Sequence, residues 1–532
     1  MGTKLWNVMI HMAADNNLKD ECIYELNEIL GIGRLTELDV VAQFDSGSSV
    51  TVYDYRVPEP DEAATSTASR AEADLVDPPE LDDIARLIIT GREELQRISD
   101  SQIIADFLQQ HGSGEKFNFI SLSGHGAGAV GEFLPSDDPP NALSIPELKS
   151  RVLEPLANRL REGKIDLLGL DSCLMSMVET CFQLQGLVRI LISAEGLEQN
   201  AGWPYHKILR DLQANPRTPP RELAKRVVRD YVRNYAPYYA SGISVDLSAC
   251  DLGDEKMNAL TSAIRHLAAR LRQNLLLPQV ESAILIAHWR AQSYKFEQYT
   301  DLWDFCHLLK TSLDNGIFNT AEFKSPSLLF DEWEAFSKTP GTPDRWAAFK
   351  ETATYWEEVR REIEDGCRDV MAAIDNVVID SGYHGAAFQH SHGLSIYFPW
   401  SKTELARNIA PYSELAFSSA TGWDQFLIAY INRTQREVRD DHGLRERGIP
   451  PMGMSPKGGA SVHPPKEPKE IDHRVTPPID TRVTPPIDTR VTPPIDTRGK
   501  LAFSPEVKNP PTEFYRENPA ALNQKTGKRH ED

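Results

Sequence analysis

Long apolar runs are missing from this 532-residue sequence, and their absence sets the first limits on what it can be. No run approaches the roughly 18 apolar residues that a membrane-spanning helix needs. The N-terminus shows no secretion signal, because the chain enters a short strand-like segment, L-W-N-V-M-I-H-M, by residue 5. Position 6 is not serine or threonine, so myristoylation of Gly2 is not indicated. The sequence therefore predicts a soluble, cytoplasmic protein without a membrane partner.

Cysteine is scarce and scattered. No C-x-x-C pair occurs, so a zinc ribbon or zinc finger has no support. The apolar or helical surroundings of several thiols are typical of reduced, buried cysteines in a cytoplasmic protein. The six are Cys22, Cys173, Cys181, Cys250, Cys306 and Cys367.

Basic residues are outnumbered, with 57 Lys and Arg against 78 Asp and Glu and a formal net charge of −21. Such a surface repels phosphate backbones, so nucleic acid is not expected as a partner. It would suit a cationic substrate or a divalent metal, although acidity is more often only a feature of solubility. The 40% apolar composition is enough for a substantial core.

The N-terminal part alternates between strand and helix patterns. Apolar segments at 5–12 and 38–44 enclose a helical pattern at 21–30, which is the rhythm of parallel strands joined by a crossover helix. A possible hairpin at 50–57 leads into residues 58–80, which are rich in Ala, Ser, Thr, Pro, Asp and Glu. Without apolar periodicity, this segment is predicted to be a mobile acidic loop.

The pattern continues through residue 432. We expect helices at 81–95, 101–110, 146–161 and 174–185, a linker at 130–143, strands at 117–122, 165–170, 188–193, 241–247 and 393–399, mainly helices over 285–373, and a last helix at 423–432.

Two of these strands end beside reactive side chains. The strand at 165–170 stops at Asp171-Ser172-Cys173, and the strand at 117–122 is followed by S-G-H-G, which contains His125. Ligands of open α/β sheets bind at the carboxyl ends of the strands, so these loops are expected to meet. A thiol is a nucleophile when a base activates it, and His before Cys with a gap of roughly 50 residues also occurs in caspases. The pair therefore predicts a His–Cys dyad.

Backbone amides complete this hypothesis. Glycines around His125 allow close approach of a substrate, and the amides of Gly126 and Cys173 are candidates to bind a tetrahedral oxyanion. Each residue alone has a plainer interpretation, a loop histidine and a core cysteine. Only their conjunction at two strand ends makes the site specific.

The C-terminal part, 435–532, has a different composition. It is rich in Pro and charged residues and contains three copies of R-V-T-P-P-I-D-T. Paired prolines disfavour helix and remove donors, and an eight-residue period is too short for a solenoid with its own core. We expect an extended, disordered tail that serves as a linker or docking segment.

Several motifs resemble the clostripain family of cysteine peptidases, which belongs to the caspase-like clan. The resemblance spans about 4–432, and its most specific motif is the D-x-C-L-M block with an upstream H-G. The motifs are W-N-V-M-I-H-M-A-A-D-N-N-L (6–18), S-G-H-G-A-G (123–128), D-L-L-G-L-D-S-C-L-M-S-M-V-E (166–179), S-A-E-G-L-E-Q-N-A-G-W-P-Y (193–205), S-V-D-L (244–247), Y-T-D-L-W-D-F (299–305) and G-L-S-I-Y-F-P (393–399). Relatives often carry tryptophans around the H-G motif that this chain lacks, which affects the expected shape of the substrate groove.

This resemblance implies an α/β fold with a caspase-like, mostly parallel sheet flanked by helices. The peptidase core would span 1–250, and a mainly helical region at 251–434 would complete it. Catalysis would use His125 as general base and Cys173 as nucleophile, through an acyl-enzyme.

The resemblance also implies cleavage after Arg or Lys, with Asp171 lining the pocket for the basic side chain. A carboxylate there would pair with a guanidinium, although Asp171 could instead cap the helix at 174–185. Glu195 and Glu198 could add negative charge to the pocket, or be solvated loop residues.

Relatives often need calcium and internal cleavage. Asp15 and Asp45 are weak candidates for metal binding, because no EF-hand or other defined calcium loop occurs. No cofactor is otherwise indicated.

The sequence thus predicts a cysteine endopeptidase that acts on proteins or peptides with basic cleavage sites. A partner protein, a metal or self-processing would control it, because unregulated activity in the cytoplasm would be harmful. The alternative is a non-catalytic caspase-like scaffold that docks through its Pro-rich tail.

Overall fold

The computed structural model describes residues 4–33, 35–56, 86–91, 100–137, 140–241, 243–294, 298–314 and 343–440. The predicted acidic loop at 58–80 and the repeats of the tail lie outside these residues. Within the ranges given, no helix has the length and apolar character needed to cross a membrane.

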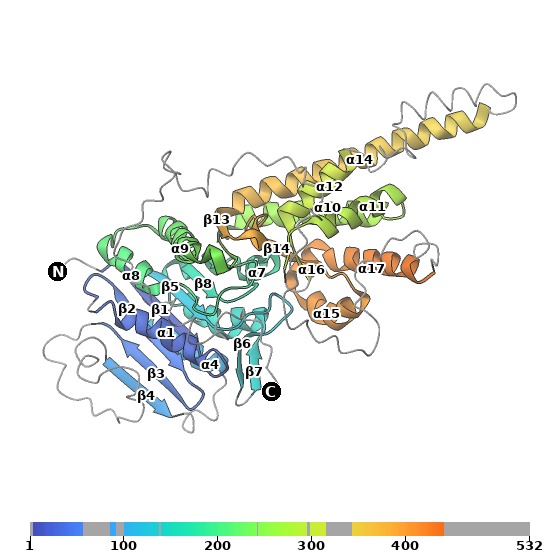
Figure 1. Cartoon of the computed structure of the whole chain (residues 1–532). Helices are drawn as coiled ribbons and strands as arrows, with labels where there is room; N and C mark the ends of the chain where they lie inside the picture. The colour runs from blue at the N-terminus through green and yellow to red at the C-terminus, as the bar shows by residue number, and fades with distance from the viewer. Residues whose placement is uncertain are drawn as a thin grey trace.

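A nine-stranded sheet forms the centre of the fold (Figure 1). The five central strands are parallel, and two antiparallel strands extend the sheet at each edge. This confirms the predicted α/β class with a mostly parallel sheet. The strand order is β13 (Val378–His384), β10 (Val245–Asp251), β9 (Val188–Ser193), β8 (Ile165–Asp171), β5 (Phe117–Ser123), β1 (Trp6–Ala13), β2 (Asp39–Asp45), β3 (Ser49–Asp54) and β4 (Arg86–Gly91).

The central strands are apolar on both faces, because helices cover both sides of the sheet. Every residue of β1, β2 and β8 is buried. Successive side chains of a strand point to opposite faces, so Met9 packs in one core and Val8 and Ile10 pack in the other. Continuous apolar runs are therefore what this position in the sheet requires.

Two sets of helices form the outer layers (Figure 1). Buried apolar residues of each set pack against one face of the sheet. One face carries α1 (Lys19–Leu30), α8 (Tyr205–Ala214) and α9 (Pro220–Tyr235), and the other carries α4 (Asp100–His111), the helical segment 145–157 and α7 (Val178–Leu184).

The C-terminal region shares one of these cores with the sheet, and it supplies the edge strand β13. A small sheet of β11 (Ser293–Tyr294), β12 (Tyr299–Asp301) and β14 (Ser395–Tyr397) touches the segment before α7 through a bridge between Met177 and Ser395. The remaining α-helices of the described residues are α10 (Asp254–Asn274), α11 (Pro278–Arg290), α12 (Leu302–Asp314), α14 (Pro343–Val377), α15 (Lys402–Glu414), α16 (Ala416–Thr421) and α17 (Trp423–Asp440).

Three local predictions were wrong. The helix expected at 81–95 is replaced, over 86–91, by strand β4, where pairing with β3 overrides the helical pattern. The linker expected at 130–143 contains a hairpin of β6 (Phe133–Asp137) and β7 (Pro140–Leu143). The helix expected from 174 begins only at Val178, because the amides of Leu174 and Ser176 bond to the loop after β9 instead.

Candidate active site

The register of two neighbouring strands places the predicted catalytic residues. Ser123 is paired with Asp171 across β5 and β8, and the amide of Gly124 donates to the carbonyl of Asp171 at 3.2 Å. His125 and Cys173 each follow two residues after this pair. Because the strands are parallel, both residues leave the same edge of the sheet at the same level.

Gly126 brings the two loops into contact. A Cβ on Gly126 would lie 2.5 Å from the carbonyl oxygen of Cys173 and 2.9 Å from Cβ of Ser172. No side chain fits in that space, so the glycine permits a close approach of backbone to backbone. The residue after His125 therefore packs directly on the residue proposed as nucleophile.

The thiol of Cys173 lies under the loop that follows β9. Its side chain is 0% exposed, and Sγ accepts a hydrogen bond from the amide of Glu198 at 3.3 Å. Leu174 has a φ of 67°, and its amide donates to the carbonyl of Gly196 at 2.9 Å. This left-handed conformation is unfavourable for leucine, so tertiary contacts must maintain the turn after the cysteine.

His125 is also buried, with 5% exposure. Its Nε2 lies 2.7 Å from Oδ1 of Asn17, in the loop between β1 and α1. Its carbonyl accepts from the amide of Leu134, and the hydroxyl of Tyr299 donates to the nearby carbonyl of Ala127 at 2.6 Å. The histidine loop is thus held by three separate parts of the chain.

Asp171 is the last residue of β8, two positions before the cysteine, and is 0% exposed. Its Oδ2 accepts hydrogen bonds from the hydroxyl of Tyr205 at 3.0 Å and from the amide of Trp203 at 3.3 Å. The alternative role as a helix cap does not apply, because α7 has Met177 at its N-cap and no side-chain cap bond.

Further buried carboxylates surround Asp171, and sequence reasoning found only one of them. Glu198 is 0% exposed, so it is not a solvated loop residue, and it accepts from the indole of Trp203 at 3.1 Å. Glu25, from α1, accepts from the hydroxyl of Ser123 at 2.8 Å and was not predicted. The signal in the sequence that could have identified Glu25 was an acidic residue among the apolar positions of an amphipathic helix.

The electrostatic effect of these carboxylates appears at two tyrosines. Burial raises the pKa of Tyr205 well above its usual value of 10, and the charges of Asp171 and Glu25 raise it further. Burial also raises the pKa of Tyr231, with smaller contributions from Glu198 and Asp171. The carboxylates of this site thus act on the same buried tyrosines, in the direction that disfavours a further negative charge.

Glu195 makes its contacts elsewhere. Its Oε2 accepts from the amide of Gly393 at 2.7 Å, and burial followed by the charges of Asp301 and Asp246 raises its pKa well above the usual value. Asp246 accepts from the amides of Glu195 and Gly196, and burial raises its pKa to about 7. The side chain of Glu195 therefore links the loop after β9 to the C-terminal region, whereas Asp171 is bonded within 203–205.

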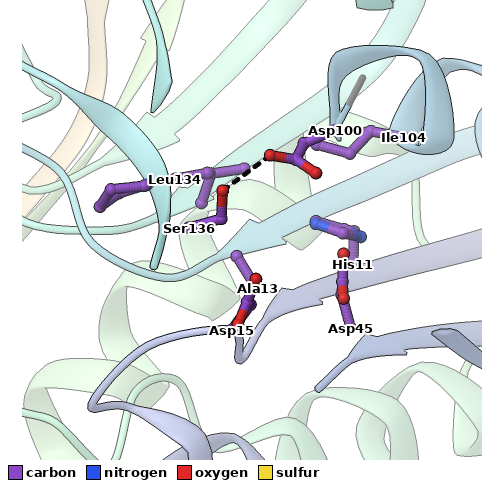
Figure 2. Close-up of a pocket in the computed structure, with 9 residues that line it drawn as sticks. His11, Ala13, Asp15, Asp45, Asp100, Ile104, Leu134 and Ser136 are labelled. Carbon is purple, nitrogen blue, oxygen red and sulfur yellow. Dashed lines mark hydrogen bonds between the residues drawn. The ribbon is translucent and has the colours of Figure 1, made fainter. Parts of the chain in front are cut away.

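Asp15 and Asp45 lie together at the ends of β1 and β2 (Figure 2). They line a cavity of about 20 Å³ with His11 and Asp100, which is room for a single water molecule. In the part of the chain that the structure describes, no three His, Cys, Asp or Glu side chains are grouped to hold a metal ion. The geometry gives no support to a metal site at this cavity.

A mostly parallel sheet that is flanked by helices and has a histidine and a cysteine at its carboxyl edge is the arrangement expected of a caspase-like cysteine peptidase. The family model described as Peptidase C11, clostripain family, matches residues 10–430. The chain belongs to the clostripain family of cysteine peptidases.

Solved structures to which the chain is similar include a secreted C11 cysteine protease from Bacteroides thetaiotaomicron in complex with an irreversible peptide inhibitor. It is 15% identical, with 79% of this chain and 99% of that chain covered and a TM-score of 0.49. An inactive zymogen C11 protease from Parabacteroides distasonis is also 15% identical over the same shares, with a TM-score of 0.45. A search of curated proteins gave no significant match.

Proposed function

We propose that this peptidase cleaves after Arg or Lys through a dyad of His125 and Cys173. The observation that carries the proposal is the register of β5 and β8, which brings both residues to one edge with Gly126 packed on Cys173. The alternative of two unrelated residues, a loop histidine and a core cysteine, would not require this arrangement.

The chemistry follows from the residue types. His125 takes the thiol proton, and Sγ of Cys173 attacks the scissile carbonyl carbon. The amides of Gly126 and Cys173 would stabilise the oxyanion, which collapses as His125 returns the proton to the leaving amine. Water activated by His125 then hydrolyses the thioester, which restores the thiol.

The preference for a basic residue rests on Asp171. Its carboxylate lies two residues before the nucleophile, and Glu198 and Glu25 add negative charge around the same segment. A guanidinium or ammonium group entering this region would replace repulsion among carboxylates by attraction. Glu195 is left out of the proposed pocket because its bonds are with the C-terminal region.

The closed state of the site supports regulation. Cys173 and Asp171 are both 0% exposed, so a substrate carbonyl cannot reach the thiol in this arrangement. The loop at 194–198, whose backbone bonds to Cys173 and Leu174, must shift before catalysis. A partner protein, calcium or internal cleavage would drive this change, which would restrict a peptidase of this preference to its activated state.

Turnover of defined peptides tests the function. Purified wild type and Cys173→Ala are incubated with peptides that carry Arg, Lys, Asp or Leu at the scissile position, with and without calcium and with limited proteolysis as an activating step. The expected result is cleavage after Arg and Lys by wild type alone. Failure to detect Cys173-dependent turnover under any of these conditions would favour the non-catalytic scaffold.

A further inference from the structure

The hydrogen bond between His125 and Asn17 identifies a residue that a dyad mechanism does not use. The Nε2 of His125 lies 2.7 Å from Oδ1 of Asn17. An amide oxygen only accepts hydrogen bonds, so Nε2 must carry the proton in this contact. In a neutral ring, Nδ1 is then the nitrogen with the lone pair that can take a proton from a thiol.

We propose that Asn17 is the positioning residue of the active site, which makes the arrangement a Cys173–His125–Asn17 triad. The inference rests on the proposed catalytic roles of Cys173 and His125. Asn17 would fix the tautomer and the orientation of the imidazole and stabilise the imidazolium that forms when the thiol loses its proton. As a neutral acceptor it would do so without trapping the proton on the ring.

The sheet places the three residues in the order that this role requires. The strands β8, β5 and β1 are neighbours, and the loops at their carboxyl ends carry Cys173, His125 and Asn17. The register of β1 and β5 pairs Met12 with Ser123, so the loop with Asn17 starts beside the loop with His125. The base therefore lies on the strand between nucleophile and acceptor.

The neighbouring residue, Asn16, makes the hydrogen bonds that hold the same loop in place. Asn16 donates from Nδ2 to the carbonyls of Ala13 and Pro135 at 3.1 and 2.8 Å, and its Oδ1 accepts from the amide of Leu18 at 2.9 Å. Asn17 does not cap α1, since Leu18 occupies the N-cap without a side-chain bond. The Asn17 side chain is exposed, yet it bonds to a ring that is nearly fully buried. Asn16 therefore stabilises the loop, and Asn17 contacts the histidine.

The experiment compares Asn17→Ala, Asn17→Asp and the matched control Asn16→Ala in the full-length protein. The pH dependence of kcat/KM is measured with a basic peptide, and the unfolding midpoint is measured for each variant. Asn17→Ala should lower kcat/KM roughly 10- to 100-fold. The limb of the pH profile that reports the pKa of His125, called the His125 limb below, should move to lower pH, because the imidazolium loses its acceptor. Asn17→Asp should recover part of the activity and move the same limb to higher pH, because a carboxylate favours the charged ring.

The control separates positioning from folding. Asn16→Ala should lower the unfolding midpoint and leave the His125 limb in place. Wild-type kcat/KM and an unmoved limb in Asn17→Ala, or limbs that move the same way in Asn17→Ala and Asn17→Asp, would overturn the role of Asn17.

A second measurement keeps this inference separate from the proposed function. After the activating step that shifts the loop at 194–198, the rate at which iodoacetamide alkylates Cys173 is followed by peptide mass spectrometry between pH 5 and 9, which requires no turnover. Absence of Cys173-dependent peptide cleavage would contradict the proposed function. Alkylation that is slower near neutral pH in Asn17→Ala and faster in Asn17→Asp would still support Asn17, and identical profiles in the two variants would contradict it.

Discussion

Glu25 of α1 and Asp171 at the end of β8 both place a carboxylate oxygen within 3.0 Å of the position that a Cβ on Gly202 would take. A Cβ on Gly202 would collide with the Glu25 carboxylate and would lie 3.0 Å from Oδ2 of Asp171. Two buried acidic side chains thus converge on one glycine, and the hydroxyl of Tyr205 donates to the nearer of the Asp171 oxygens. The segment around Gly202 therefore has little room for added atoms.

Gly202→Ala should therefore be far more damaging than an ordinary glycine substitution. Its φ of 61° already disfavours alanine, and the added methyl group would displace two carboxylates. We expect the free energy of unfolding to fall by roughly 2–4 kcal/mol in denaturant titrations. The control is Gly186→Ala, because Gly186 has a φ of 85° and, among the residues described, no atom lies within 4 Å of the position that an added methyl group would take. It should lose only about 1 kcal/mol, and equal losses would show that crowding at Gly202 is unimportant.

Asp171→Asn should change the substrate preference. The amide keeps nearly the same shape but loses the charge that would attract a guanidinium, so kcat/KM for Arg peptides should fall roughly 100-fold or more. Turnover of a Leu peptide should fall much less. Tyr205→Phe is the comparison variant, because it removes a hydroxyl that donates to Asp171 and leaves the carboxylate in place. The same loss for every peptide would assign Asp171 a structural role.

The sequence was sufficient to predict those parts of the site that lie directly after a single strand. Apolar runs locate β5 and β8, and the residues that follow each run place His125 and Cys173 at one edge. The approach of Glu25 to Asp171 depends on how α1 packs across the sheet, which no local pattern contains. The contact of Asn17 with His125 likewise joins loops of different strands.

Conversely, two residues that are close in sequence were wrongly expected to share one pocket. Glu195 and Glu198 are neighbours on one loop, yet Glu195 bonds to Gly393 of the C-terminal region and Glu198 bonds to Trp203. The edge strand β13 was not predicted, because it follows directly after the long helix α14 and gains its identity from pairing with β10. The contacts of the two glutamates and the formation of β13 both depend on tertiary pairing, which cannot be read from a single sequence.

Glu179 should make stability fall as pH rises. Burial raises its pKa from 4.5 to about 7, although the amide of Tyr397 and the hydroxyl of Tyr412 donate to it at 2.9 Å. The folded state therefore binds the proton more tightly, so the stabilisation is fully present below pH 4.5 and is lost as pH rises through 7. Glu179→Gln does not titrate and keeps an acceptor oxygen. Between pH 5 and 8 its free energy of unfolding should gain about 2–3 kcal/mol relative to wild type.

The Glu179 measurement needs an exposed comparison, which Glu255→Gln on α10 provides. Its difference from wild type measures what the loss of an exposed carboxyl contributes over the same pH range. A constant difference for Glu179→Gln would mean that the carboxyl of Glu179 titrates as it does in the unfolded chain.

Tyr299→Phe should show that the C-terminal region supports the histidine loop. The hydroxyl of Tyr299 donates to the carbonyl of Ala127 at 2.6 Å, and its ring occupies the space that a side chain at Gly128 would need. Without the hydroxyl, kcat/KM should fall roughly 3- to 10-fold and the free energy of unfolding should fall by about 1 kcal/mol. The matched control is Tyr430→Phe, because Tyr430 is similarly buried and its hydroxyl has no hydrogen-bond partner among the described residues. Removing that hydroxyl should leave both quantities unchanged or raise stability slightly, since a buried polar group without a partner is itself unfavourable. If Tyr299→Phe behaved like Tyr430→Phe in both measurements, the contact between β12 and the loop after β5 would have no part in holding His125.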